Sequence, residues 1–233
     1  MTSCAMDPGA RKRLLLEGVQ RTLGNCRRCD LCHIRQNIVF GGGNPDAPIM
    51  IVAGTVTWQE DASGIVLKGD HGALVAQAMA EVGLDISQDV FVTVAVKCQR
   101  PQTIKDGEKT RMDVTDAQRA ACSKFLRAQL AAVNPVIVVA HGRLASEVLF
   151  GESRPFGAYC GSWRMFGKNR IALATHNPAG LTFGERQSLQ PEYYEAWRGL
   201  AERLNLLGRL WRPDAGCFQR GWQLPADIAG AIQ

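Results

Sequence analysis

Four short segments of the chain are almost entirely apolar, and longer segments with apolar residues at helical spacing lie between them. Uniformly apolar segments of this length are typical of strands buried on both faces, and they cover residues 49–53, 90–96, 136–140 and 171–174. The helical spacing predicts helices over residues 10–24, 72–83, 115–132, 143–150 and 191–206. Strands alternating with helices favour an α/β fold, a three-layer α/β/α sandwich with a central four-stranded parallel sheet.

This arrangement also predicts where a site lies, because open parallel sheets bind ligands beyond the carboxyl ends of their strands. The segments that leave those ends carry His71, His141 and His176, three of the four histidines of the chain. Three histidines at one edge favour a functional role for at least one of them, whereas a single histidine is more often structural.

The charge of the chain favours a nucleic acid as its partner. The net charge is +5, and 20 of the 27 basic residues are arginine, whose guanidinium group suits phosphate oxygens. An ordinary basic surface is the alternative. The sequence shows neither an export signal nor an apolar run long enough to span a bilayer, so we expect a cytoplasmic protein without a membrane partner.

Four of the eight cysteines have the spacing of metal ligands. Cys26 and Cys29 form a C-x2-C pair, and Cys98 and Cys122 follow as remote single cysteines. A thiolate-bound metal ion or an iron–sulfur cluster needs soft ligands that converge in this way from separate segments. Disulfides are the less favoured interpretation in a reducing compartment. Cys32 is either a substitute ligand or a buried bystander.

Five segments along the chain share one known pattern. They are C-R-R-C-D-L-C-H-I-R-Q-N-I-V-F-G-G-G-N-P-D-A-P-I-M-I-V, E-D-x-x-G, V-K-C, A-A-C and P-V-I-V-V-A-H-G-R-L-A. In these segments the chain resembles the iron–sulfur uracil-DNA glycosylases of the family-four type. The resemblance implies that Cys26, Cys29, Cys98 and Cys122 hold a structural [4Fe–4S] cluster. It also implies one uracil-DNA-glycosylase-like domain over residues 1–207, followed by a C-terminal extension over 208–233.

The chain departs from this family at positions where its members recognise uracil. Gly54, beside Thr55, replaces an acidic residue that helps to activate the attacking water, and Leu67 replaces a stacking phenylalanine. Val94 replaces the asparagine that reads the uracil edge. We therefore expect that the base pocket, formed by Gly54, Thr55, Leu67, Val94 and His141, has lost bidentate recognition of uracil.

The last motif, T-H-N-P-A-G-L, is similar to that of the mismatch-specific uracil/thymine glycosylases. Asn177 stands where the family-four pattern has histidine, and His176 precedes it. By this resemblance Pro178 and Gly180 lie close to the DNA backbone. Leu181 is either a wedge that opens the duplex or a plain core leucine.

A long insertion separates Cys98 from Cys122. It carries four basic residues, Arg100, Lys105, Lys109 and Arg111. We expect a basic loop that either holds a strand of DNA, with Arg100 and Arg111 as contacts, or has no function.

Excision of a base requires a positioned water and stabilisation of an oxocarbenium-like sugar or of the departing base. The candidate catalytic residues are Glu60, Asp61, His176 and Asn177, although the two carboxylates are alternatively helix caps or solvent-facing groups. We expect a DNA glycosylase that removes a damaged or modified base other than ordinary uracil. The alternatives are a nucleic-acid-binding module that has lost hydrolysis and an enzyme that acts on a free nucleoside or nucleotide.

Overall fold

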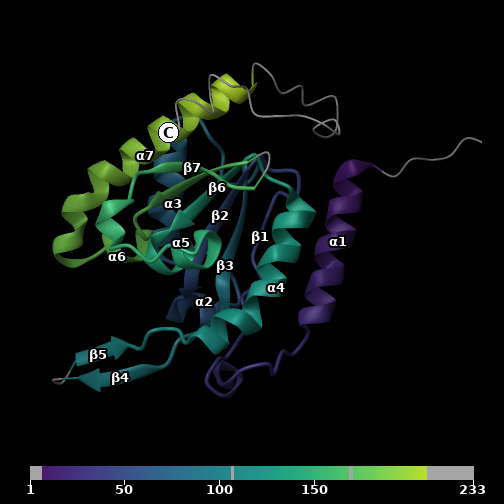
Figure 1. Ribbon diagram of the computed structural model, residues 1–233, viewed down its shortest axis with the longest axis vertical. Helices are drawn as coiled ribbons and strands as arrows, with labels where there is room; N and C mark the ends of the chain where they lie inside the picture. Colours follow the sequence, from purple (N-terminus) through teal and green to yellow (C-terminus); the bar gives the residue numbers. More distant parts are fainter. Residues whose placement is uncertain (1–6, 106–107, 168–169, 209–233) are drawn as a thin grey trace, which may run out of the picture.

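The computed structural model describes residues 7–105, 108–167 and 170–208, and Figure 1 shows how they are arranged. The C-terminal extension expected over residues 208–233 lies outside the described residues, apart from its first position.

A six-stranded mixed sheet forms the centre of the fold. From one edge to the other, its strands are β1 (Gly42–Gly43), β3 (Val90–Gln99), β2 (Ile49–Val56), β6 (Ile137–His141), β8 (Ile171–Thr175) and β7 (Trp163–Met165). The four inner strands are parallel, as the sequence predicts. The short edge strands β1 and β7 are antiparallel to their neighbours. The predicted three-layer α/β/α sandwich is confirmed.

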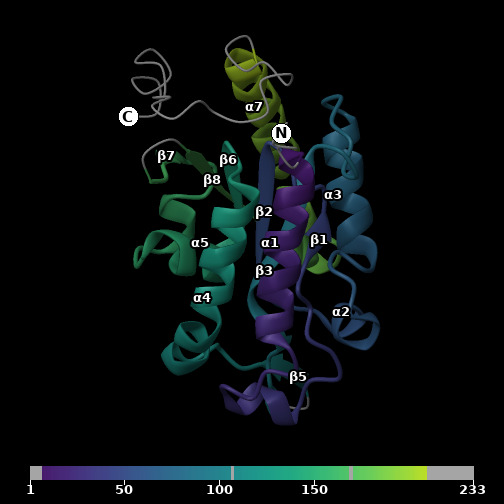
Figure 2. The same ribbon diagram turned by 90° about the vertical axis from the view of Figure 1, so that its right-hand side faces the viewer.

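Helices cover both faces of this sheet (Figures 1 and 2). All five predicted helices are present, as α1 (Pro8–Leu23), α3 (Asp70–Ala80), α4 (Asp116–Val133), α5 (Gly142–Phe150) and α7 (Gln190–Gly208). Helices α1 and α4 lie side by side on one face, and α3 and α7 lie on the other. Shorter helices occur in the loops, namely α2 (Trp58–Ser63), α6 (Pro178–Leu181), η1 (Asp30–His33), η2 (Phe156–Ala158) and η3 (Gly184–Leu189).

Strand β2 shows how the two cores are separated. Successive side chains of a strand point to opposite faces. Ile49 and Ile51 therefore pack with α3 and α7, whereas Met50 and Val52 pack with α1 and α4. All four side chains are completely buried, which explains why the segment is apolar throughout.

The insertion after Cys98 is a hairpin and not the loop that the sequence predicts. Strands β4 (Gln102–Lys105) and β5 (Glu108–Arg111) pair antiparallel as a separate two-stranded sheet. Figure 1 shows it projecting from the end of the molecule where β3 finishes. Its sequence is too polar for the apolar pattern of a buried strand, so pattern alone could not reveal it.

Within the described residues, no helix is both long enough and apolar enough to cross a membrane.

Candidate functional site

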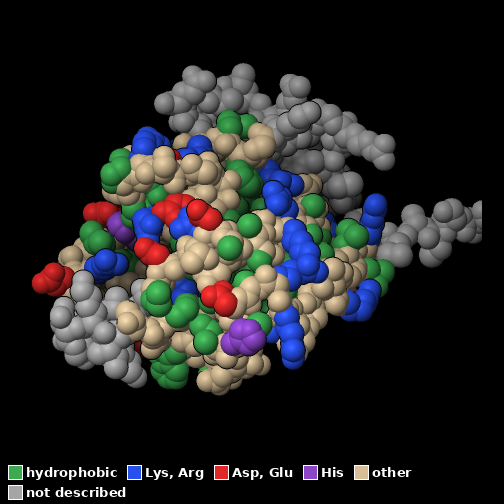
Figure 3. Space-filling view, turned by 60° about the horizontal axis from the view of Figure 1, so that its bottom comes forward, with side chains coloured by type: hydrophobic (Ala, Val, Ile, Leu, Met, Phe, Trp, Pro, Cys, Tyr) green, Lys and Arg blue, Asp and Glu red, His purple; other side chains and the backbone are tan. Residues whose placement is uncertain are grey.

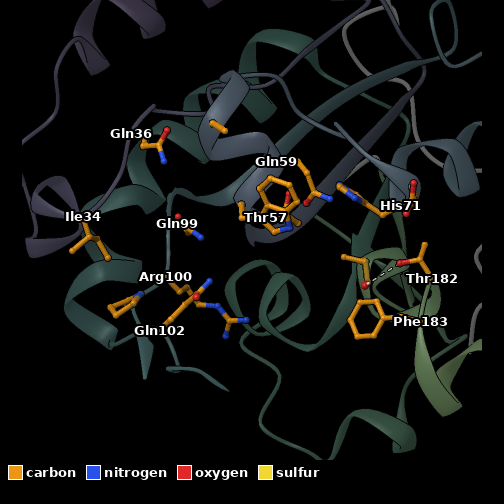
Figure 4. A pocket seen from close by; sticks show the side chains of 15 residues that line it. Ile34, Gln36, Thr57, Gln59, His71, Gln99, Arg100, Gln102, Thr182 and Phe183 are labelled. Carbon is orange, nitrogen blue, oxygen red and sulfur yellow. Dashed lines mark hydrogen bonds between the residues drawn. The ribbon is translucent and has the colours of Figure 1, made fainter. Parts of the chain in front are cut away.

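A broad cavity of about 1210 Å³ lies beyond the carboxyl ends of the central strands (Figure 4). Its wall comes from segments that follow three of these strands, residues 57–62 and 70–71 after β2, 99–102 after β3 and 179–183 after β8. Ile34 and Gln36 complete it from the cysteine-bearing segment. The cavity therefore lies at the edge of the sheet where the strand order predicts a site.

The cavity wall is rich in amide and aromatic side chains, which sequence reasoning did not select. Gln36, Gln59, Gln99 and Gln102 all line it. At its edge Trp58 is 60% exposed and Phe183 is 68% exposed. Figure 4 shows Thr57 and Gln59 on one side of the cavity, Phe183 on another, and Arg100 with Gln102 on a third. Trp58 and Phe183 each follow the end of a central strand in the sequence. This placement could have identified them as candidates.

Glu60 is buried and its carboxylate is saturated by local hydrogen bonds. It forms a capping box with Thr57, whose backbone N donates to Oε2 at 2.7 Å, while the Thr57 side chain accepts from Glu60 N. Leu67 N donates to Oε1 at 2.7 Å, and His71 Nε2 lies 3.3 Å from the same oxygen. Burial alone would raise the pKa of Glu60, but the hydrogen bonds from His71 and the backbone lower it overall.

Asp61 is also buried, and it fixes the neighbouring loop. Its carboxylate accepts hydrogen bonds from the backbone N of Gln36 and of Asn37, and its carbonyl oxygen accepts from the Asn37 side chain. Neither Asp61 nor Glu60 is among the residues that line the cavity. The capping alternative is observed for Glu60, and the direct catalytic role of both carboxylates stays a prediction.

The three histidines at the strand ends occupy three different environments. His71 lines the cavity from the first turn of α3. His141 is buried behind it, with its Nε2 3.3 Å from the Tyr193 hydroxyl. His176 faces a separate pocket, where its Nε2 lies 2.9 Å from Glu192 Oε2. His176 is thus not among the residues of the broad cavity, and its catalytic role stays a prediction.

We expect His141 to make the fold sensitive to acid. Burial, helped by the nearby His71, lowers the pKa of His141 to about 3, whereas an unfolded histidine titrates near pH 6.5. Between these values the unfolded chain takes up a proton that the folded chain does not, so stability is lost as the pH falls. The free energy of unfolding should fall by roughly 1.4 kcal/mol per pH unit for this proton.

Denaturant unfolding of the wild type and of a His141→Phe variant at pH 5 and 6.5 measures this effect. The variant keeps a ring against Tyr193 and Trp197, and its loss of stability over this interval should be smaller by about 2 kcal/mol. His33→Gln, at an exposed histidine, should follow the wild type. Equal losses of unfolding free energy between pH 6.5 and pH 5 in His141→Phe and the wild type would contradict the prediction.

Three of the four cysteines with ligand spacing, Cys29, Cys98 and Cys122, pack in one cluster near the carboxyl end of β3, and Cys26 lies in the neighbouring core. Burial raises the pKa of Cys98 to about 12, and it also raises the pKa values of Cys122 and Cys29. The thiols interact electrostatically, Cys29 with Cys26, Cys98 and Cys122, and Cys122 also with Cys26 and Cys98.

Two basic side chains lie near these thiols. Arg35 Nη1 lies 3.7 Å from Cys98 Sγ, and the buried Lys97 interacts electrostatically with Cys98 and Cys122. In the part of the chain that is described, no three His, Cys, Asp or Glu side chains are close enough to hold a single metal ion. Burial lowers the pKa of Lys97 to about 7, so Arg35 is the lasting positive charge beside this loose set of four soft ligands.

The profile of the uracil DNA glycosylase superfamily matches residues 40–201, well over half of the chain. The chain belongs to the uracil-DNA glycosylase superfamily. Among similar proteins, the type-4 uracil-DNA glycosylase of Archaeoglobus fulgidus is 29% identical over 80% of this chain and 92% of its own length. That of Sulfurisphaera tokodaii is 31% identical over 72% of this chain and 76% of its own, and that of Saccharolobus solfataricus is 28% identical over 76% and 83%. The resemblance found in the sequence is confirmed.

The positions that departed from the glycosylase pattern do not line the broad cavity. A Cβ atom on Gly54 would lie 3.1 Å from Leu144 Cβ, so a side chain there would be in tight contact with Leu144. Val94 is fully buried and packs with Val39 and Val56. Both positions thus lie in apolar packing in this superfamily member, and their place in a base pocket stays a prediction.

The remaining base-pocket residues are also structural. Thr55 lies within β2 and pairs with Val96. Leu67 adopts a left-handed backbone conformation, with φ 58°, and its side chain packs against the core with α3 and α7.

The last glycosylase motif forms the start of α6, and its leucine is part of the core. Asn177 caps the helix, with Oδ1 accepting from Ala179 N at 3.2 Å. Leu181 is 1% exposed and packs in the core with α3 and α7. A wedge must be free to enter DNA, so the wedge assignment of Leu181 is corrected in favour of its core alternative. Exposed Phe183, two residues later, stands at the cavity edge instead.

The other residues proposed to contact DNA are divided between the cavity and its surroundings. Pro178 is buried and Gly180 is half-buried, next to the cavity-lining Ala179. Arg100 lines the cavity, and its Nη1 lies 3.7 Å from Asp113 Oδ1. The side chain of Arg111, in β5, lies outside the described residues.

Proposed function

We propose that this protein binds DNA in the broad cavity and excises a damaged or modified base other than ordinary uracil. Membership of a superfamily whose relatives are named uracil-DNA glycosylases supports the reaction class. One observation carries the proposal: the cavity at the strand ends combines two exposed aromatic rings with four amide side chains. Aromatic rings stack with bases, and amides bind base edges through paired donors and acceptors.

The size of the cavity supports a nucleic acid strand as the substrate. Pockets for small molecules occupy roughly 300–1,000 Å³, and this open cavity is larger, at about 1210 Å³. A strand with a base turned out of its stack fills such a space better than a free nucleoside.

The surface charge suits the phosphate backbone. On the face shown in Figure 3, Lys and Arg side chains gather along one flank, and most acidic side chains lie away from them. Exposed basic residues of the cysteine-bearing segment and α4 include Arg27, Arg28, Lys124 and Arg127. Neutralising phosphates with such residues makes binding weaken as salt is added.

Ordinary uracil is a poor candidate for the excised base. Recognition of its edge needs a group that both donates and accepts, whereas Val94, Val39 and Val56 form a closed apolar cluster. The amides of the open cavity suit any base edge with an adjacent donor and acceptor, so only Val94 counts against uracil.

We also propose that Cys26, Cys29, Cys98 and Cys122 hold a [4Fe–4S] cluster with a structural role. The thiols come from three separate segments and interact with one another. Arg35 supplies positive charge beside them, which suits thiolates around a cluster. The bound group would tie the segment of residues 26–36 to β3 and α4.

A second candidate function is DNA binding without excision. Specific observations favour it, since Glu60 and Asp61 are saturated by local hydrogen bonds and His176 pairs with Glu192.

A panel of modified oligonucleotides separates these functions. Single-stranded and duplex substrates carrying uracil, deaminated purines, mismatches or modified pyrimidines are incubated with the protein, and alkali-labile sites are measured. We expect cleavage at a modified base and little at uracil. Efficient excision of uracil would contradict the proposed specificity. Tight, salt-dependent binding without cleavage of any substrate would favour the second candidate, and absence of binding would exclude both.

Trp58→Ala and Phe183→Ala should each weaken DNA binding. Loss of one stacked base costs about 1–3 kcal/mol, which corresponds to roughly a 5- to 150-fold increase in Kd. Fluorescence anisotropy with a labelled single strand measures this change. Leu14→Ala removes a similarly exposed apolar side chain from α1 and serves as the control. Equal affinities for all three variants would show that the two rings do not contact DNA.

A further inference from the structure

We propose that His71 is the catalytic base of this site and that Glu60 is its positioning residue. This inference rests on the proposed excision function. Of the three histidines at the strand ends, His71 lines the cavity. No sequence motif assigns it a role.

The geometry resembles the carboxylate–histidine part of a hydrolytic triad. His71 Nε2 lies 3.3 Å from Glu60 Oε1. Glu60 cannot rotate away, because Thr57 and Leu67 donate three further hydrogen bonds to its carboxylate. A carboxylate only accepts, so Nε2 carries the proton of this contact and Nδ1 is left as an acceptor.

The remaining acceptor of His71, Nδ1, lies on the same side of Gly69 as the amide nitrogen of Gln59. A Cβ atom built on Gly69 would lie 3.6 Å from His71 Nδ1 and 3.2 Å from Gln59 Nε2. The two nitrogens therefore border the same small space, which glycine leaves unfilled. Figure 4 shows the side chains of His71 and Gln59 lying close together at this wall. In the proposal, a water that enters the cavity beside these two nitrogens donates to Nδ1 and accepts from the Gln59 amide.

The charges around His71 suit an imidazole that takes up a proton during the reaction. Glu60 faces it from α2 and stabilises the positive form. Asp70, beside it on α3, also lines the cavity. His141 lies behind it on β6, and burial keeps that side chain neutral. Arg100 is the cation of the facing wall.

The proposed step is hydrolysis of the N-glycosidic bond. The oxygen of the water forms a bond to C1′ of the deoxyribose, and its proton moves to His71 Nδ1. The N-glycosidic bond breaks, and its electron pair leaves with the base, which is then protonated from solvent. His71 afterwards returns its proton to solvent. The products are a free base and an abasic sugar with a hydroxyl group at C1′.

Single-turnover excision by His71→Gln tests the proposal on a substrate cleaved in the oligonucleotide panel. The glutamine amide can still donate to Glu60 but cannot accept a proton near neutral pH. We expect the rate constant to fall about 100-fold or more, while the Kd for DNA changes little. His33→Gln, at an exposed histidine outside the cavity wall, should retain the wild-type rate.

Three further measurements separate chemistry from folding. The rate constant of excision by the wild-type protein should increase with pH as a single proton is lost. The His71→Gln variant should lack this pH-dependent increase. Glu60→Gln should move this increase toward lower pH, because an imidazolium without a neighbouring carboxylate loses its proton more readily. Added imidazole should restore activity to His71→Ala, as expected for a missing base in a folded site.

The outcomes distinguish this inference from the function on which it rests. The role of His71 is overturned if the excision rate constant of His71→Gln stays within about threefold of the wild-type value, or if its pH dependence matches that of the wild type. Either result leaves the glycosylase function standing. Absence of excision by the wild-type protein on every substrate overturns both.

Discussion

Cys98→Ser should yield protein with little iron and a strongly reduced resistance to unfolding. Serine is a poor ligand for iron, and the folding energy supplied by a structural metal centre can reach about 10 kcal/mol. Cys98 is buried at the end of β3, so loss of the cluster also frees the segment that carries Cys26 and Cys29. Iron and acid-labile sulfide analysis of anaerobically purified protein, together with thermal unfolding, measures both effects.

Cys32→Ser is the matched control for this experiment. Cys32 lies in η1 between the C-x2-C pair and Arg35, but it is not among the cysteines that pack together as Cys29, Cys98 and Cys122 do in the described structure. Its serine variant should keep the iron and the stability of the wild type. Equal iron contents in both variants, or one tightly held zinc ion in the wild type, would overturn the cluster assignment.

Gly72→Ala should destabilise the fold by about 3 kcal/mol, at the upper end of the effect of overpacking. A Cβ atom on Gly72 would overlap the carbonyl oxygen of Leu67. Leu67 cannot easily retreat, because it already holds a left-handed conformation and its N–H donates to Glu60. Thermal unfolding should show a Tm lower by about 6–12 °C.

Gly157→Ala provides the comparison for Gly72→Ala. A Cβ atom there meets no atom within 4 Å, and the position has no positive φ. This variant should stay within about 0.5 kcal/mol of the wild type. Similar stabilities for the two alanine variants would mean that the loop before α3 readily rearranges.

The sequence predicts the centre of the fold better than its edges. Strands β2, β3, β6 and β8 are buried on both faces, and this requirement makes their segments uniformly apolar. Strand β1 consists of Gly42 and Gly43, which carry no side-chain pattern. Strand β7 is only partly buried. Edge strands of this kind depend on pairing with a neighbour, which a single sequence does not reveal.

The location of the site was predictable, but most of its residues were not. The strand order places it at the carboxyl ends, and the cavity lies there. The segment Thr57-Trp-Gln-Glu60 has the spacing of a capping box, so the structural use of Glu60 could have been recognised. The burial of Leu181 could not have been recognised, because the segment N-P-A-G-L does not indicate that the leucine packs into a core.

Helix α2 separates the determinants of folding from those of recognition within six residues. Trp58, Gln59 and Ala62 face the cavity, whereas Glu60 and Asp61 hold the surrounding loops. Exchanges at the outward positions therefore leave the internal hydrogen bonds intact. New base preferences can evolve on this helix by single substitutions, with little risk to the scaffold that presents them.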